Sequence, residues 1–80
     1  MKVVTIHIHV EDARELRRIE ARIRKLGHII AESYLRAPDK NGIWQIRSAS
    51  YVVLTEDPRR LKIAMRQIDY HSKAHLLIGS

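Results

Sequence analysis

The 80-residue sequence lacks cysteine and phenylalanine and contains only two prolines and three glycines. Without cysteine the chain forms no disulfide, no thiolate metal site and no cysteine nucleophile, a composition typical of the reducing cytoplasm, where we expect this protein. No apolar run exceeds four residues, whereas a membrane-spanning helix needs about 20, so we predict no membrane partner. A chain this short has room for one hydrophobic core, and we predict a single domain over residues 1–80.

The few glycines also bear on catalysis. Gly27, Gly42 and Gly79 are too far apart to build a phosphate-binding loop. No serine has the setting of a nucleophile, and no carboxylate pair has the setting of an acid/base couple. We therefore expect a protein without enzymatic activity.

The hydropathy pattern of the first part predicts a strand followed by a helix. Apolar residues alternate with polar ones over residues 2–10, as in a strand with one buried face. Asp12 then has the position of a helix N-cap, and apolar residues recur at helical spacing over 13–26 until Gly27.

The remaining pattern predicts a hairpin, a second helix and a last strand. Alternation resumes from residue 28 to Pro38, and a turn at 39–42 leads to a strand over 43–54. A four-residue turn sets residue 38 opposite 43, which places Ile30 opposite Tyr51 and Leu35 opposite Ile46. Asp57 and Pro58 are typical of a helix start, so we predict a helix that ends near Asp69 and a strand over residues 70–78.

This order predicts an α+β protein with a ferredoxin-like βαββαβ fold. Right-handed crossovers arrange these elements as a four-stranded antiparallel sheet, order 4-1-3-2, with two helices on one face. The other face is left open, and we regard it as the first candidate for binding.

Two segments on the predicted central strands resemble the motifs of the RNA recognition motif family. Ile6 to Val10 occupies the place of the shorter motif and Arg47 to Leu54 that of the longer one. In that family the open sheet face presents aromatic rings that stack on bases. The resemblance implies that this protein binds nucleic acid through its sheet.

The charge of the chain agrees with such a partner, because a formal net charge of +6 favours polyanions. Basic groups interleaved with rings serve both phosphates and bases. The predicted nucleic-acid contacts are His7, Tyr34, Arg36, Arg47, Tyr51 and Lys73. Most of the excess charge falls on the helices, where we favour ordinary solvated faces over phosphate contacts.

Other segments resemble ACT domains, which are small regulatory modules that bind effectors at subunit interfaces. The likeness lies in Val10-Glu11-Asp12 before the first helix and in the stretch from Ile29 to Pro38. It implies an alternative function as a homodimeric regulatory or protein-interaction domain.

The predicted hairpin tip supports a homo-oligomer or another protein partner independently of this resemblance. The tip extends past the helices, so its apolar side chains have little of their own chain to cover them. The predicted interface residues are Leu35, Trp44 and Ile46. The alternative is that the tip curls over the helix ends and Trp44 closes the core.

Histidines give a third hypothesis. His7 and His9 lie two apart on one predicted strand, and His71 and His75 fall on the neighbouring one, so one ion could be held by all four. The cofactor would be a divalent metal such as zinc. The alternative is that the histidines are solvated surface residues and the protein has no cofactor.

Overall fold

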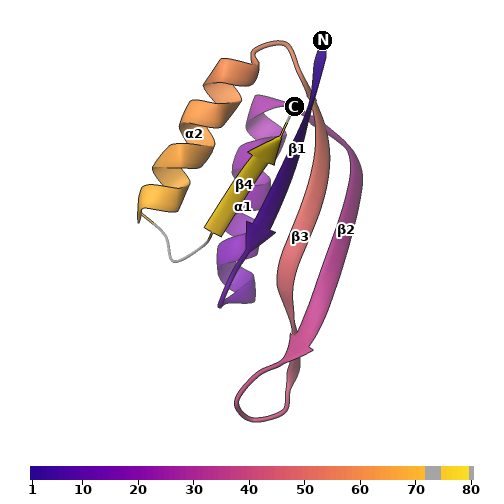
Figure 1. The fold of residues 1–80 in the computed structure, drawn as a ribbon, viewed down its shortest axis with the longest axis vertical. Helices are drawn as coiled ribbons and strands as arrows, with labels where there is room; N and C mark the ends of the chain where they lie inside the picture. Colours follow the sequence, from indigo (N-terminus) through magenta and orange to yellow (C-terminus); the bar gives the residue numbers. More distant parts are fainter. Residues whose placement is uncertain (72–74, 80) are drawn as a thin grey trace.

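A computed structural model describes the backbone of residues 1–71 and 75–79 and the side chains of residues 1–68 (Figure 1). Strand β1 (Lys2–His9) leads to helix α1 (Ala13–Leu26). The strands β2 (His28–Pro38) and β3 (Trp44–Thr55) then form a long hairpin. Helix α2 (Pro58–His71) and strand β4 (His75–Gly79) complete the chain. The predicted α+β class and the βαββαβ order are confirmed.

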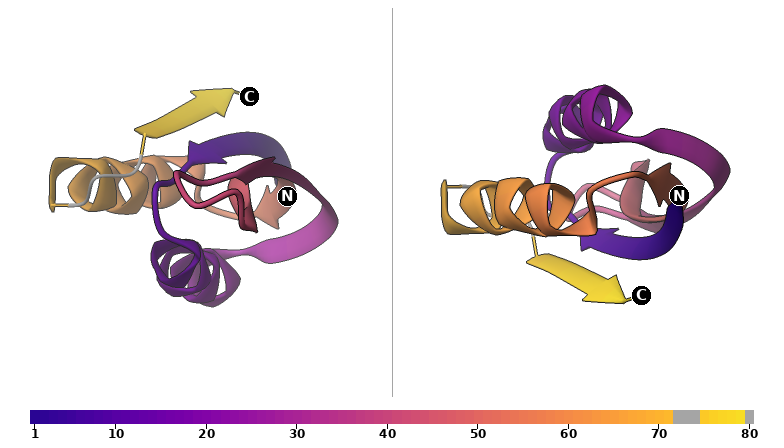
Figure 2. Two further views of the ribbon diagram at one scale, coloured as in Figure 1. Left: turned by 90° about the horizontal axis from the view of Figure 1, so that it is seen from below. Right: turned by 90° about the horizontal axis from the view of Figure 1, so that it is seen from above.

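The strands lie in the order β2-β3-β1-β4, and each neighbouring pair is antiparallel. Figure 2 shows α1 along one side of the strands β1 to β3. Both helices contribute to the same core as the sheet, since Ile19 and Ile23 of α1 and Leu61 and Met65 of α2 are buried with the inward side chains of β1 and β3. One sheet face is therefore covered by helices, as the sequence predicts.

Gly27 ends α1, as predicted, and close packing explains the choice of residue. Its backbone is extended, with φ −171° and ψ −178°, and its N–H donates to the carbonyl of Ile23 at 3.0 Å. A Cβ at this position would lie 2.6 Å from Cγ1 of Val53 and 2.8 Å from the carbonyl oxygen of Leu54. Only glycine lets the end of α1 approach β3 so closely.

The predicted four-residue turn of the hairpin is wrong by one residue. Pro38 pairs with Trp44, so five residues, 39–43, make the connection. Asp39 organises it, because Oδ1 accepts from the backbone N–H of Asn41 and Ile43, at 2.8 and 2.9 Å. Gly42 adopts the left-handed conformation, with φ 78°, that the turn requires.

Two β-bulges add a second difference. The register of β2 and β3 shifts between Ile29 and Ala31 and again between Leu35 and Arg36, which leaves Ile30 and Arg47 unpaired. Between the bulges Glu32 pairs with Tyr51, and Tyr34 pairs with Ala49. Each one-residue shift moves side chains to the opposite face, so the predicted assignment of faces in this hairpin fails at its centre.

Helix α2 runs past its predicted end. It continues to His71, and β4 begins at His75, where we predict a helix end near Asp69 and a strand from Tyr70. No glycine or proline lies between Pro58 and Gly79 to stop the helix earlier.

Candidate interaction surface

The strands β1, β3 and β2 form one helix-free face of the sheet. In β1 the residues of this face alternate with the buried Val4, Ile6 and Ile8. Their pairing partners identify the residues of the same face on β3 and then on β2. We call this surface the open face. Its described residues are Val3, Thr5, His7, His9, His28, Ala31, Ser33, Leu35, Ser48, Ser50, Val52 and Leu54.

One hydrogen bond on the open face connects neighbouring strands. Nδ1 of His7 lies 2.7 Å from Oγ of Ser50, the residue paired with it across β1 and β3. The contact confirms that side chains of these two positions lie on the same face. It also engages one ring nitrogen of His7 and leaves Nε2 for a further contact.

The open face carries no lysine, arginine, aspartate or glutamate among the twelve described residues that form it. Charged residues make up 30% of the whole chain, so this face differs sharply from the rest of the molecule. It consists of small polar, aliphatic and imidazole side chains.

Tyr51, a predicted nucleic-acid contact, lies in the core and not on the open face. It is fully buried, paired with Ile6 on one side and Glu32 on the other. The prediction fails because the bulges shift the register that assigned it to the open face. A ring with no exposed surface offers no platform for a base.

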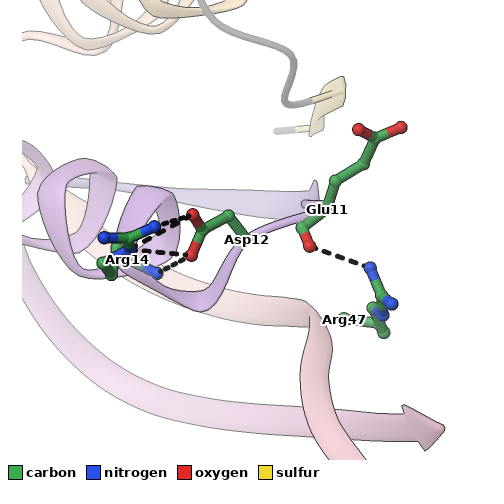
Figure 3. A network of polar contacts seen from close by, with 4 residues as sticks. All are labelled: Glu11, Asp12, Arg14 and Arg47. Atoms are coloured by element: carbon green, nitrogen blue, oxygen red, sulfur yellow. Dashed lines mark hydrogen bonds and ion pairs between the residues drawn. The ribbon is translucent and has the colours of Figure 1, made fainter. Parts of the chain in front are cut away.

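The other predicted contacts do not come together. Tyr34 lies on the helix side of β2, and the register places Arg36 there as well, opposite the partly buried Ile46. Arg47, the bulge residue of β3, uses its guanidinium to donate to the carbonyl of Glu11 at 2.8 Å (Figure 3). His7 remains on the open face, and Lys73 lies outside the described residues.

Only part of the histidine prediction can be compared with the structure. The backbones of His9 and His75 are direct partners across β1 and β4. His71 ends helix α2, so its predicted place on the last strand is wrong. The described side chains contain no group of three or more histidines or acids that could hold a metal ion, and the side chains of His71 and His75 fall outside that set.

The predicted apolar patch at the hairpin is divided between the two faces. Leu35 pairs with Ser48 on the open face, whereas Ile46 packs against the core on the helix side and Trp44 shares its strand parity. Leu35 and Trp44 are each 66% exposed. The hairpin projects beyond the helices, as predicted (Figure 1), so within the described part of the chain Trp44 does not close the core.

A polar cluster at the edge of β2 was missed by sequence reasoning. The hydroxyl of Tyr34 lies 3.0 Å from Oε2 of Glu32 and 3.3 Å from Oε1 of Glu20, and Arg24 pairs with the same Glu20 oxygen at 2.9 Å. The spacing of Glu20 and Arg24 marks a helical pair, but their contact with β2 depends on the bulged register.

Burial affects the two tyrosines of this edge. Desolvation raises the pKa of Tyr51 far above its usual value of 10.0. It raises the pKa of Tyr34 less strongly, since this ring is half exposed. Both phenols therefore remain protonated at neutral pH and act as neutral side chains.

The segment between β1 and α1 holds a further group of polar contacts (Figure 3). Asp12 caps α1, because its Oδ1 accepts from the backbone N–H of Arg14 at 2.9 Å. The Arg14 guanidinium binds the same carboxylate, with 3.0 Å from Nη2 to Oδ2. This hydrogen bond lowers the pKa of Asp12 below its usual value.

Comparison with known proteins gives a structural similarity alone. No family model matches the chain, and no curated protein is similar enough in sequence to count as a relative. The resemblances to RNA recognition motifs and ACT domains therefore gain no support. A solved structure described as a "putative antibiotic biosynthesis monooxygenase from Deinococcus radiodurans" is similar over 99% of this chain and 91% of its own, with 11% identity and a TM-score of 0.42.

This similarity contradicts one expectation. We expect no enzymatic activity from the sequence, but the similar protein is described as a monooxygenase, which is an enzyme. That expectation is withdrawn. Separately, no helix among the described residues is both long enough and apolar enough to cross a membrane.

Proposed function

We propose that this protein is a self-associating interaction module whose open face binds a second copy of the chain. The observation that carries the proposal is the absence of charge from the described open face, in a chain with a net charge of +6. Large neutral patches on a charged protein are typical of surfaces that another protein covers.

Electrostatics favour a second copy as the partner. Two molecules with a net charge of +6 repel each other wherever their cationic surfaces meet. In a two-fold dimer, the same open-face residues of two copies lie opposite each other. None of the described ones is charged, so this arrangement avoids the repulsion. Serine and threonine side chains can exchange hydrogen bonds across such a contact.

The open face is smaller than a standard interface. On β3 it runs from Ser48 to Leu54, about 23 Å at 3.3 Å per residue, and three strands about 4.8 Å apart are about 14 Å wide. The described open face thus offers on the order of 300 Å² per partner, against about 800 Å² in a standard interface. A contact of this size is typical of a weak dimer that forms only at high protein concentration.

Sedimentation velocity over about 1 to 200 μM protein tests the proposal. We expect the sedimentation coefficient of the unmodified protein to rise to that of a dimer within this range. Ser50→Arg places a cation at the centre of the open face. In the dimer the two introduced arginines would lie close together and repel each other, so this variant should be monomeric.

Leu35→Arg and Ile63→Arg form a matched pair of further variants. Both replace an aliphatic residue that is more than half exposed, but Leu35 lies on the open face and Ile63 on α2. We expect Leu35→Arg to weaken the dimer and Ile63→Arg to leave it intact. A monomer at every concentration, or equal weakening by both variants, would overturn the proposal.

The nucleic-acid interface predicted on this face has less support. Of its six residues, only His7 lies among the described residues of the open face, and none of those residues is basic apart from histidine. Phosphates need lysine or arginine, so the open face fits another protein surface better than a polyanion.

A further inference from the structure

The two helices enclose a groove on the opposite side of the molecule from the open face. It is open to solvent and has a volume of about 350 Å³. Helix α1 and helix α2 both contribute to its walls. The lining residues are Arg22, Lys25, Leu26, Arg60, Ile63, Ala64 and Gln67.

The charge of this groove has one sign. Arg22 and Lys25 come from α1 and Arg60 from α2, and no acidic residue is among the seven that line it. Leu26 and Ala64 supply an apolar floor, and both are partly buried. Three cations from two helices thus point to an anionic ligand.

The cations of the groove have no acidic partner within residues 1–68. Ion pairs there join Asp12 to Arg14 and connect Arg24 with Glu20 and Glu32. None of these pairs involves Arg22, Lys25 or Arg60. Their charges are therefore available to a ligand.

The groove also lies where the excess charge of the whole chain is concentrated. The two helices contain ten of the 15 lysines and arginines but only three of the nine acids. They carry a formal charge of +7, and the rest of the chain carries −1. The potential of the protein thus directs a polyanion to the helices and away from the sheet.

A second recess extends the groove around the end of α1. It shares Lys25, Leu26 and Arg60 with the groove and adds Arg24 and His28, although Glu56 and Asp57 also line it. The unpaired cations of this recess, Lys25 and Arg60, are the ones that it shares with the groove, so the free positive charge is concentrated in the groove itself. A flexible chain of phosphates can enter this concave groove, whereas a flat bilayer reaches only its rims.

We propose that the groove between α1 and α2 binds the phosphodiester backbone of a nucleic acid through Arg22, Lys25 and Arg60. No aromatic residue lines the groove, so the contact reads phosphates and not bases. Binding is then independent of sequence and strongly dependent on salt. The site does not rest on self-association, and a dimer joined through its open faces leaves both grooves accessible.

Fluorescence anisotropy with a labelled 20-nucleotide oligothymidine tests the site. The test variant is the triple substitution Arg22→Gln, Lys25→Gln and Arg60→Gln. Its control, Lys2→Gln, Arg36→Gln and Lys40→Gln, removes the same three charges at exposed positions outside the helices. Circular dichroism checks that both variants are folded.

We expect the groove variant to bind the oligonucleotide on the order of ten- to a hundredfold more weakly at low salt, and the control to bind nearly as tightly as the unmodified protein. The slope of log K against log salt should fall by about two in the groove variant, since a single strand contributes about 0.7 per phosphate contact.

Three results would overturn the proposal. The first is that the unmodified protein binds no oligonucleotide. The second is that both triple variants lose affinity equally, which would show that only net charge matters. The third is that vesicles with 30% phosphatidylserine compete with the oligonucleotide at equal phosphate concentration. None of these results bears on the dimer, which sedimentation measures separately.

Discussion

The ring of Tyr34 meets the ring of Tyr51 edge to face, with 6.1 Å between the centroids and 86° between the planes. The two hydroxyls nevertheless have opposite surroundings. That of Tyr34 reaches Glu20 and Glu32, whereas that of Tyr51 is buried and has no hydrogen-bond partner among the described residues. Of these two neighbouring tyrosines, one therefore has a hydrogen-bonded hydroxyl at the edge of the sheet, and the other has a hydroxyl without a described hydrogen-bond partner in the core.

Removal of the buried hydroxyl should therefore not weaken the fold. We expect Tyr51→Phe to raise the free energy of unfolding by up to about 1 kcal/mol, because it removes a polar group that burial leaves without a partner. Urea denaturation followed by circular dichroism measures the change. Tyr34→Phe is the matched control and should be destabilising, since it takes a donor from two carboxylates. A loss above about 1 kcal/mol in Tyr51→Phe would show that the hydroxyl has a partner.

The raised pKa of Tyr51 predicts a loss of stability at alkaline pH. In the unfolded chain the phenol ionises near its usual pKa of 10.0, but in the folded protein it stays protonated to higher pH. Above about pH 10 the unfolded state therefore binds fewer protons than the folded state, and stability falls as pH rises.

The slope of that loss should approach about 1.4 kcal/mol per pH unit for this one group. Urea denaturation at several values between pH 9 and 11.5 measures it, and Tyr51→Phe supplies the comparison because it keeps every other group. We expect the slope to be smaller in Tyr51→Phe. Identical slopes in the two proteins would contradict a role for Tyr51.

Thr55 joins three elements at the end of β3. It is buried, its hydroxyl donates to the carbonyl of Leu26 at 3.1 Å, and it accepts from the N–H of Asp57 at 3.2 Å. The hydroxyl thus connects the end of α1 with the start of α2. We expect Thr55→Val to cost about 2 kcal/mol, because it keeps the shape but leaves both backbone groups without this partner.

Thr55→Ser tests that explanation, since it keeps the hydroxyl and removes only a methyl group. It should cost about 1 kcal/mol, less than the valine variant. Thermal denaturation of the two variants side by side measures the difference. If serine proves the more harmful of the two, packing and not hydrogen bonding determines the role of Thr55.

The elements of this fold can be predicted from the sequence, because each has a clear local signal. Strand β1 alternates from Val4 onward, α1 lies between its caps Asp12 and Gly27, and α2 begins after Asp57. These signals depend on neighbouring residues alone. They determine the order of the elements and the residues of the helical core.

The faces of the hairpin cannot be predicted in the same way. Strand β3 has apolar residues at both parities, with Tyr51 and Val53 alternating with Val52 and Leu54. Its pattern therefore does not say which set is buried, and the choice depends on the turn and on two bulges that have no strong local signal. Because of this ambiguity, the sequence pattern predicts the wrong face for Tyr51 and does not predict that the open face is neutral.

Arg47 shows what this change of register means for experiment. The sequence predicts that Arg47 is a nucleic-acid contact on the sheet, so that its loss weakens binding and leaves the fold intact. In the structure it is the bulge residue of β3, and both its backbone and its side chain form hydrogen bonds with the segment between β1 and α1. Its carbonyl accepts from the N–H of Val10 at 2.8 Å, and its guanidinium donates to the carbonyl of Glu11 at 2.8 Å.

Arg47→Ala should therefore lower stability and leave nucleic-acid binding through the helices almost unchanged. We expect a cost of about 1 kcal/mol, since the backbone contact to Val10 survives and only the side-chain contact is lost. Urea denaturation and oligothymidine anisotropy on the same sample separate the two effects. Arg36→Ala is the control, because it removes the same charge from an exposed position of β2 that, among the described residues, makes no hydrogen bond or ion pair with the β1–α1 segment. A variant of Arg47 that keeps full stability but binds oligonucleotide tenfold more weakly than Arg36→Ala would return the nucleic-acid site to the sheet, because net charge is equal in the two proteins.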